Sequence, residues 1–160
     1  MELRTYLISK LLWDVNADVD KLKQEFFTGY YEVAAPFIKE YYDLNEQAVI
    51  NSGNRLDIYG YPINGVESYL TPELIKKYDE LFVKAYQSTD RKTIKERIRY
   101  LELPHHFAKI ELAMSNISPD LTFFTMIKGK KVVKPEMLQL LERFVEDCNE
   151  MGITNLEEHG

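Results

Sequence analysis

Glu102, His105 and His106 are the residues whose types and spacing come closest to a chemical site. Glu102 and His106 are four residues apart, so on a helix their side chains share a face and could bind a metal ion with a third ligand from elsewhere. His105, however, lies on an apolar stripe, where a buried neutral histidine bonded to a backbone carbonyl is the more common arrangement. No second cluster of histidine or aspartate supplies the missing ligands. We therefore predict no catalytic residue, no metal and no cofactor, and keep a self-sufficient enzyme built on these three residues as an alternative.

The second candidate is the segment NSGNRLDIYGYPINGVESY, residues 51–69, in which helical periodicity disappears. Connections of this length are uncommon in compact domains and are usually functional or mobile. The segment contains Tyr59, Tyr61, Asn64 and Tyr69. Flat aromatic faces beside short polar groups suit a sugar ring, so we take these four residues as candidate substrate-binding residues. The same rings also suit a loop that packs onto its own helices, which is the more common outcome.

Other patterns that carry chemistry are missing from the sequence. It contains neither a glycine-rich phosphate loop nor a nucleophile elbow. Cys148 is the only cysteine, so no internal disulfide can form, and its place on an apolar stripe indicates a small core residue. The net charge of −6 argues against nucleic acid or an anionic membrane as the main partner. No apolar run approaches the roughly 18 residues of a membrane span.

Apolar residues recur at steps of three and four over most of the chain, which predicts amphipathic helices. Capping residues, prolines and glycines mark where these helices start and end. We expect Asp18 to cap a second helix that ends at Gly29, and Pro36 to lie near the start of a third. Thr71–Pro72 should begin a fourth helix, and Ser88–Asp90 should cap a fifth. Pro135 should begin a sixth helix, which ends at Gly152.

The fifth helix is apolar on two opposite sides, and Pro104 is expected to bend it. A helix of this kind is enclosed between other elements, so we predict that it forms the centre of the domain. One side carries Ile94, Ile98, Leu101, His105, Ala108 and Leu112, and the other carries Leu103, Phe107, Ile110, Met114 and Ile117.

The segment after this helix is irregular, and its Phe123, Phe124 and Ile127 could form a strand-like patch with Val132 and Val133. A chain of 160 residues is long enough for one domain with a sizeable core and too short for two domains. We therefore predict a single all-α domain over residues 1–160. It would be a bundle of about six helices, with one central two-sided helix and a long loop rich in tyrosine, glycine and asparagine.

Four stretches of the sequence resemble a known family: ELRTYLISKLLWD, NADVDKLKQEFFTGYYEVAAPFIKEYYDL, YLTPELI and RFVEDCNEMGITNLEE. The most specific parts are KLLW at residues 10–13, and GYY at residues 29–31 followed by AAP at residues 34–36. They resemble the C-terminal helical region of a bacterial domain-of-unknown-function family found in large glycoside-hydrolase-like, alpha-glucuronidase-like proteins. The resemblance extends over nearly the whole chain.

The resemblance implies that this chain is a fragment of a larger multidomain protein. In such proteins a (β/α)-barrel precedes the helical region and holds the cleavage chemistry, and no alternation of strands and helices is found here. The implied function is a non-catalytic accessory module that packs beside, or lines, a glycan-binding barrel. The parent would be exported, with a signal peptide upstream. The alternative is a helical protein–protein interaction module unrelated to carbohydrate.

Overall fold

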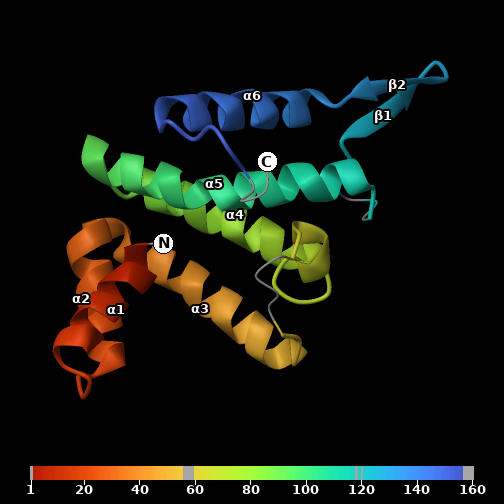
Figure 1. The fold of residues 1–160 in the computed structure, drawn as a ribbon. Helices are drawn as coiled ribbons and strands as arrows, with labels where there is room; N and C mark the ends of the chain where they lie inside the picture. The colour runs from red at the N-terminus through yellow and green to blue at the C-terminus, as the bar shows by residue number, and fades with distance from the viewer. Residues whose placement is uncertain (1, 56–59, 118, 120, 157–160) are drawn as a thin grey trace.

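The structure, a computed structural model, describes residues 2–55, 60–117, 119 and 121–156. As predicted, this part of the chain is mainly helical (Figure 1). The α-helices are α1 (Glu2–Trp13), α2 (Val19–Tyr31), α3 (Ala35–Ser52), α4 (Pro72–Gln87), α5 (Lys92–Ser115) and α6 (Pro135–Glu150). The 3-10 helices are η1 (Glu32–Ala34) and η2 (Pro62–Gly65), and the strands are β1 (Phe124–Ile127) and β2 (Lys130–Val133).

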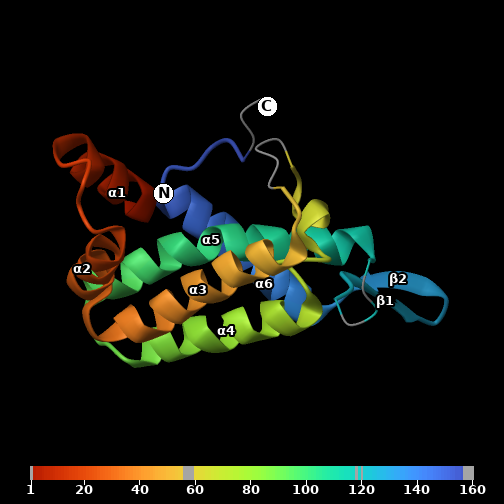
Figure 2. The same ribbon diagram turned by 90° about the horizontal axis from the view of Figure 1, so that it is seen from below.

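The central helix α5 has neighbours on opposite sides, as its two apolar stripes predict (Figures 1 and 2). Its N-terminal half packs against α2 and α4, and Ile94 and Ile98, whose side chains are fully buried, join the core that these helices share with α3. Aromatic rings dominate this main core, because α2, α3 and α4 each contribute tyrosine or phenylalanine. The buried members are Phe26, Phe27, Tyr31, Ala34, Ala35, Ile38, Tyr78, Phe82, Ala85, Ile94 and Ile98.

A second core lies on the other side of α5, where α6 and the segment before β1 cover it. Leu103 and Ile110 of the predicted second stripe are buried there, and so is Cys148. Met114 and Ile117 of the same stripe are instead 53% and 42% exposed. Met114 lies in the last turn of α5 and Ile117 lies beyond the end of this helix at Ser115, so the predicted stripe extends past the elements that cover α5.

Several of the predicted helix boundaries are confirmed. The Asp18 carboxylate accepts the backbone N–H groups of Asp20 and Lys21 at 3.0 and 3.1 Å, which caps α2. The Thr71 hydroxyl accepts the N–H of Leu74 at 3.3 Å and caps α4. Gly152 follows α6 in the left-handed region, with φ +68°, as expected of a glycine at a helix end.

Two predicted boundaries are wrong. Gly29 does not end α2, which continues to Tyr31, because Gly29 occupies an ordinary helical position. The cap of α5 is Arg91 rather than a residue of the Ser88–Asp90 segment. The hydroxyl of Thr89 nevertheless accepts the backbone N–H of Arg91 at 3.2 Å, so it organises the turn before the helix.

The predicted strand-like patch is confirmed as an antiparallel β-hairpin, which changes the predicted all-α class to mainly α. Phe124 pairs with Val133 and Thr125 with Val132. Lys128 and Gly129 form the turn in the left-handed region, with φ of 49° and 77°. No helix in the described part of the chain is long and apolar enough to span a membrane.

Candidate functional site

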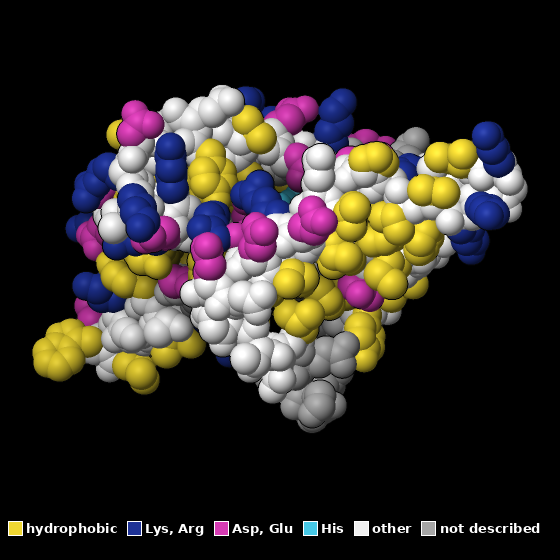
Figure 3. All heavy atoms as spheres, turned by 90° about the horizontal axis from the view of Figure 1, so that it is seen from above, with side chains coloured by type: hydrophobic (Ala, Val, Ile, Leu, Met, Phe, Trp, Pro, Cys, Tyr) yellow, Lys and Arg dark blue, Asp and Glu magenta, His cyan; other side chains and the backbone are white. Residues whose placement is uncertain are grey.

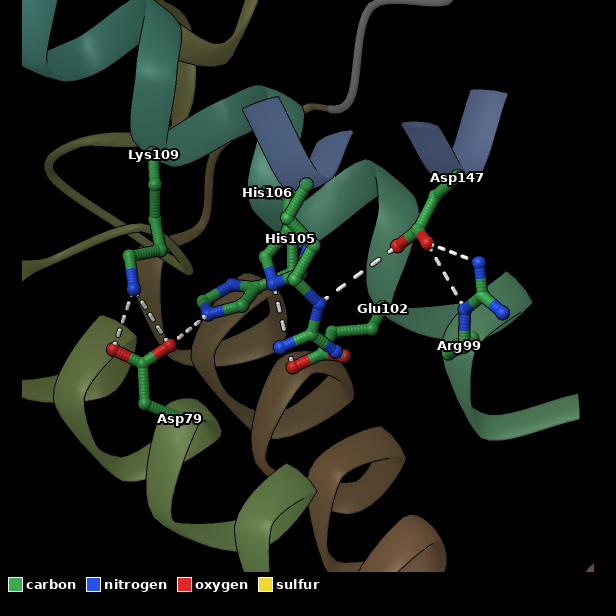
Figure 4. Close-up of polar contacts among 8 residues, drawn as sticks. Asp79, Arg99, Glu102, His105, His106, Lys109 and Asp147 are labelled. Atoms are coloured by element: carbon green, nitrogen blue, oxygen red, sulfur yellow. Dashed lines mark hydrogen bonds and ion pairs between the residues drawn. The ribbon is translucent and has the colours of Figure 1, made fainter. Parts of the chain in front are cut away.

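His105 is buried at the interface between α4 and α5, where it meets a carboxylate (Figure 4). Its Nε2 lies 2.7 Å from Oδ1 of Asp79, and its side chain is only 1% exposed. Lys109 donates to both oxygens of the same carboxylate, at 2.8 and 2.7 Å. The expected backbone carbonyl partner is therefore wrong: the imidazole belongs to a polar cluster formed by Asp79, His105 and Lys109.

The electrostatics of this cluster favour an ionised Asp79 and a neutral His105. Burial lowers the pKa of His105, and the hydrogen bond and charge of Asp79 only partly oppose that effect. Burial would raise the pKa of Asp79, but the hydrogen bond from His105 and the charge of Lys109 outweigh it and hold the pKa below its usual value. Lys109 thus supplies the positive charge that Asp79 requires, and the imidazole donates a hydrogen bond.

Glu102 and His106 do share a face of α5, as their spacing predicts. Oε1 of Glu102 lies 3.3 Å from Nε2 of His106, and both side chains are almost fully buried. The third group at this position is a cation, because the guanidinium of Arg143 on α6 donates to Oε2 of Glu102 at 2.8 Å. Among the described residues, no three side chains of histidine, cysteine, aspartate or glutamate form a group that could hold a metal ion.

Glu102, His106 and Arg143 form a polar layer between α5 and α6, and further ion pairs extend this layer along α6 (Figure 4). Asp147 is buried and bound by Arg99 of α5, whose Nε donates to Oδ1 at 3.0 Å. Arg99 also donates to Glu150 at 2.6 Å. These side-chain hydrogen bonds raise the pKa of Arg99, so its charge is permanent. The contacts join α5 and α6 in a fixed register, which is a structural role.

A hollow of about 410 Å³ lies beside Asp79. Asp79 and Lys109 line it, whereas His105 does not. The imidazole is thus placed behind the carboxylate, where it cannot touch a molecule in the hollow. The complete lining is Pro72, Glu73, Ile75, Lys76, Asp79, Lys109, Leu121 and Met137.

The loop tyrosines do not form one common site. Tyr59 lies outside the described residues, whereas Tyr61 is described and exposed. Oδ1 of Asn64 accepts the backbone N–H of Tyr61 at 2.9 Å, so this amide caps η2. Asn64 therefore has a local structural role, and Tyr61 is the candidate whose ring stands free on the surface.

Tyr69 is held against its own helices. Its carbonyl accepts a hydrogen bond from the hydroxyl of Tyr78 at 3.1 Å. Its ring packs so closely on Gly65 that a Cβ atom at that position would lie 2.8 Å from the ring. This part of the loop matches the interpretation of a segment packed onto its own bundle.

One face of Tyr69 nevertheless borders a second hollow, of about 520 Å³, which we call the tyrosine hollow. Its other walls come from α3, and its lining is Tyr42, Asn45, Glu46, Val49, Ile50 and Tyr69. The α3 residues were not predicted from the sequence, because tyrosines on an amphipathic helix usually indicate packing. The signal present was the polar pair Asn45–Glu46 one turn after a tyrosine, on a face that is otherwise apolar.

The polar groups of the tyrosine hollow are partly committed to the protein. Asn45 donates from Nδ2 to the carbonyl of Tyr41 at 2.8 Å, which leaves its Oδ1 as an acceptor. Glu46 pairs with Lys23 at 3.2 Å. Burial raises the pKa of Tyr42 to about 12, so its hydroxyl remains protonated at neutral pH and can donate a hydrogen bond.

The outer side of α1 is a third candidate surface. None of the residues of α1 is buried, although Leu3 and Tyr6 pack on the main core. Leu12 is 84% and Trp13 93% exposed, and Ile8 and Val15 are exposed beside them. Hydrophobic side chains stand at the corner of the molecule where α1 and α2 lie, at the lower left in Figure 3. We call these four residues the α1 apolar face.

Comparison with known proteins finds a family match in the N-terminal part of the chain. No curated protein and no solved structure matches the chain. Residues 1–43, which include α1, α2, η1 and the first half of α3, match the family described as "Domain of unknown function (DUF4838)". The N-terminal part of the chain, which carries both the α1 apolar face and Tyr42 of the tyrosine hollow, is therefore similar to a family whose function is unknown.

Proposed function

We propose that this chain is a non-catalytic helical module of a glycoside-hydrolase-like, carbohydrate-processing protein. In this proposal it packs beside a glycan-binding barrel, or lines the cleft of that barrel. The observation that carries the proposal is the tyrosine hollow, where two aromatic rings, an amide and a carboxylate surround one space.

The chemistry of the tyrosine hollow fits a sugar. The volume of about 520 Å³ falls within the range of small-molecule sites. Tyr42 and Tyr69 offer apolar ring surface to axial C–H groups. The hydroxyl of Tyr42 can donate to a sugar hydroxyl, and Oδ1 of Asn45 and the carboxylate of Glu46 can accept from one.

The α1 apolar face supports packing on a neighbouring domain. Soluble proteins rarely leave large contiguous apolar patches exposed unless the patch binds something. Tryptophan is also among the residues that contribute most to binding at interfaces. A barrel surface next to this face would cover Trp13 and Leu12, both now almost completely exposed.

The buried polar cluster supports the absence of independent turnover. A general acid or base must come within hydrogen-bond reach of the proton that it transfers. The imidazole of His105 is 1% exposed and bonded to Asp79, and Glu102 is held by His106 and Arg143. These contacts favour a structural role for the residues that most resemble a catalytic group.

Titration by two-dimensional NMR tests direct glycan binding. We expect oligosaccharides that contain uronic acid to shift the amides of Tyr42, Asn45 and Tyr69 in a saturable way at millimolar sugar. Ile50 lines the hollow and is exposed, so Ile50→Arg should abolish these shifts. The matched control is Val83→Arg on α4, which changes an exposed apolar residue away from this lining and should leave binding intact.

Two results would weaken the proposal in different ways. If no shifts occur at these residues or at Tyr61, the chain does not bind glycans directly, and only packing on the barrel remains. If shifts occur but persist in Ile50→Arg, the sugar binds elsewhere on the surface.

The second candidate is a helical protein–protein interaction module unrelated to carbohydrate. The α1 apolar face favours it, because that face needs a partner of any kind rather than a barrel in particular. Light scattering of the chain at increasing concentration tests self-association through this face. An oligomer that Leu12→Lys disrupts, together with no response to sugar, would favour this candidate over the first.

A further inference from the structure

The β-hairpin projects beyond the ends of the helices (Figures 1 and 2). Within the described residues its sheet consists of β1 and β2 alone, so each strand has one edge that pairs with no other strand. An unpaired edge presents backbone N–H and C=O groups that can pair with another strand.

The two edges differ in their protection. Natural proteins guard free edges with lysine, proline or a bulge. β2 carries Lys130 and Lys131, whereas β1, with the sequence FTMI, carries no charge and no proline. The pairing from Phe124 to Ile127 is regular and has no bulge. Met126 and Ile127 of β1 are also 63% and 52% exposed. The outer edge of β1 is therefore the one suited to strand addition.

Apolar side chains continue from this edge onto the neighbouring helices. In Figure 3 hydrophobic side chains gather over the end of the molecule that carries the hairpin, and lysine or arginine side chains stand beyond them. The exposed members on the hairpin, at the end of α5 and at the start of α6 are Met114, Ile117, Met126, Ile127, Val132 and Leu138.

Charge is distributed unevenly around the hairpin. Residues 121–134 contain four lysines and no acidic residue, in a chain whose net charge is −6. Within the described part of the chain, none of these lysines forms an ion pair, and neither does Glu136, which is exposed just after β2. The tip of the hairpin is thus basic, and an unpaired acid stands at its base.

We propose that two copies of this chain associate through the outer edges of their β1 strands. A two-fold axis makes the two β1 strands antiparallel, so they join the hairpins into one sheet with the order β2–β1–β1–β2. The apolar edges then cover each other, and the exposed apolar side chains of β1, Met126 on one face of the sheet and Ile127 on the other, lie beside the β1 strand of the second copy.

The charges favour this arrangement over a parallel one. In either orientation the lysine-bearing β2 strands occupy the outer positions, about 14 Å apart at three strand spacings, which exceeds the screening length of roughly 10 Å at 0.1 M salt, so their repulsion is small. The antiparallel order also brings the basic tip of each hairpin beside the base of the other, where Glu136 lies in the first turn of α6. Each copy therefore places the lysines of its hairpin tip near Glu136 of the other copy.

The strength of the association follows from its size. A stable interface buries about 800 Å² on each partner, and four residues of strand with a small apolar border bury less. The dimer is therefore weak and depends on concentration, with dissociation in the micromolar to millimolar range.

Sedimentation equilibrium over that concentration range tests the proposal on the intact chain. We expect a monomer–dimer equilibrium that Met126→Lys weakens by about tenfold or more, because it adds a positive charge to each of the two strands that meet. Met126 is mostly exposed, so its replacement should leave the fold intact, as circular dichroism would verify. The control Leu12→Lys adds the same charge to the α1 apolar face and should leave the equilibrium unchanged.

Three results would overturn the proposal. The first is a monomer at every concentration. The second is association that Leu12→Lys abolishes and Met126→Lys does not, which would assign it to α1. The third is binding of an acidic peptide or of anionic phospholipid vesicles by the hairpin with no self-association. As a second measurement on the unmodified chain, amide exchange in β1 should slow as concentration rises, and exchange that is independent of concentration would also refute the dimer.

Discussion

His105 of α5 and Asp79 of α4 share a hydrogen bond of 2.7 Å between Nε2 and Oδ1. The histidine lies behind the carboxylate, and Lys109 binds both carboxylate oxygens from the side of the hollow. The contact joins two helices at the centre of the domain, so its protonation state links pH to stability. Because the His105 side chain is buried and bonded to Asp79, the imidazole is also not available to a substrate.

The first prediction concerns the pKa of His105. Burial lowers this pKa, and Asp79 partly opposes the effect, so Asp79→Asn should lower it further. The remaining ionisable neighbours, Lys109 and His106, also favour the neutral ring. NMR titration of the ring resonances measures the value directly. A pKa of His105 that rises in Asp79→Asn would contradict the assignment.

The same shift predicts how stability depends on pH. A histidine whose folded pKa lies below its usual value of about 6.5 binds more protons in the unfolded chain. The contribution of His105 to the free energy of unfolding should therefore decrease as the pH drops below that value, and it should be constant above it. In His105→Gln this contribution to the slope should disappear, which urea denaturation at a series of pH values would reveal.

The second prediction uses two glycines with opposite surroundings. In Gly65→Ala the new Cβ would lie 2.8 Å from the ring of Tyr69 and 3.0 Å from the side chain of Leu70. Overpacking of this kind costs about 1–3 kcal/mol, so we expect a loss of stability and a looser loop. Gly29 lies inside α2 with no atom near its Cβ position, and Gly29→Ala should instead stabilise by about 0.5–1 kcal/mol. Equal effects at the two positions would contradict the packing of Tyr69 on Gly65.

Local signals made much of the fold predictable from the sequence. Asp18 and Thr71 cap helices through hydrogen bonds to residues two or three positions away, so their roles depend on short-range geometry alone. The two-sided pattern of α5 likewise follows from its own periodicity. Predictions of this type failed at Gly29, which continues α2 instead of ending it, and at Met114, where the apolar pattern continues past the elements that cover it.

The polar partners were not predictable in this way. Asp79 lies 26 positions before His105, and Arg143 lies 41 positions after Glu102. Each pair meets only because α4 and α6 pack on opposite sides of α5. The spacing of residues along the sequence does not predict that packing. The tyrosine hollow was not predictable for the same reason. Tyr69 lies beside α3 because the loop after α3 turns back toward that helix, and helical periodicity does not predict such a contact.

The third prediction compares two residues of the same predicted stripe. Ile110 is buried in the second core, and Met114, one turn later, is 53% exposed. Ile110→Ala should cost about 2–4 kcal/mol because it opens a cavity between α5 and α6. Met114→Ala should change the free energy of unfolding by less than about 0.5 kcal/mol. Chemical denaturation of both variants measures the difference, and similar losses would mean that α6 covers more of α5 than the structure shows.

The fourth prediction concerns the cation that compensates a buried acid. Arg143 is 47% exposed, but the Glu102 side chain that it binds is only 9% exposed and has His106 as its other contact. Arg143→Met keeps most of the aliphatic stem and removes the charge, so the main loss is the compensation of Glu102. We expect a cost of about 1–3 kcal/mol at neutral pH, below that of a fully buried pair because the guanidinium is partly hydrated.

A surface pair provides the control for this fourth change. Lys39 and Asp43 form an ion pair on α3 in which both side chains are exposed, so Lys39→Met should cost about 0.5 kcal/mol or less. The two variants remove the same type of contact from different surroundings, and urea denaturation under one buffer compares them directly. Arg143 serves buried carboxylates, since it binds Glu102 and its Nε also lies 3.9 Å from Oδ2 of the buried Asp147, whereas Lys39 and Asp43 are both exposed. Equal losses would therefore show that His106 satisfies Glu102, and Arg99 satisfies Asp147, without Arg143. In that case the contact between α5 and α6 would depend on the apolar second core rather than on its polar layer.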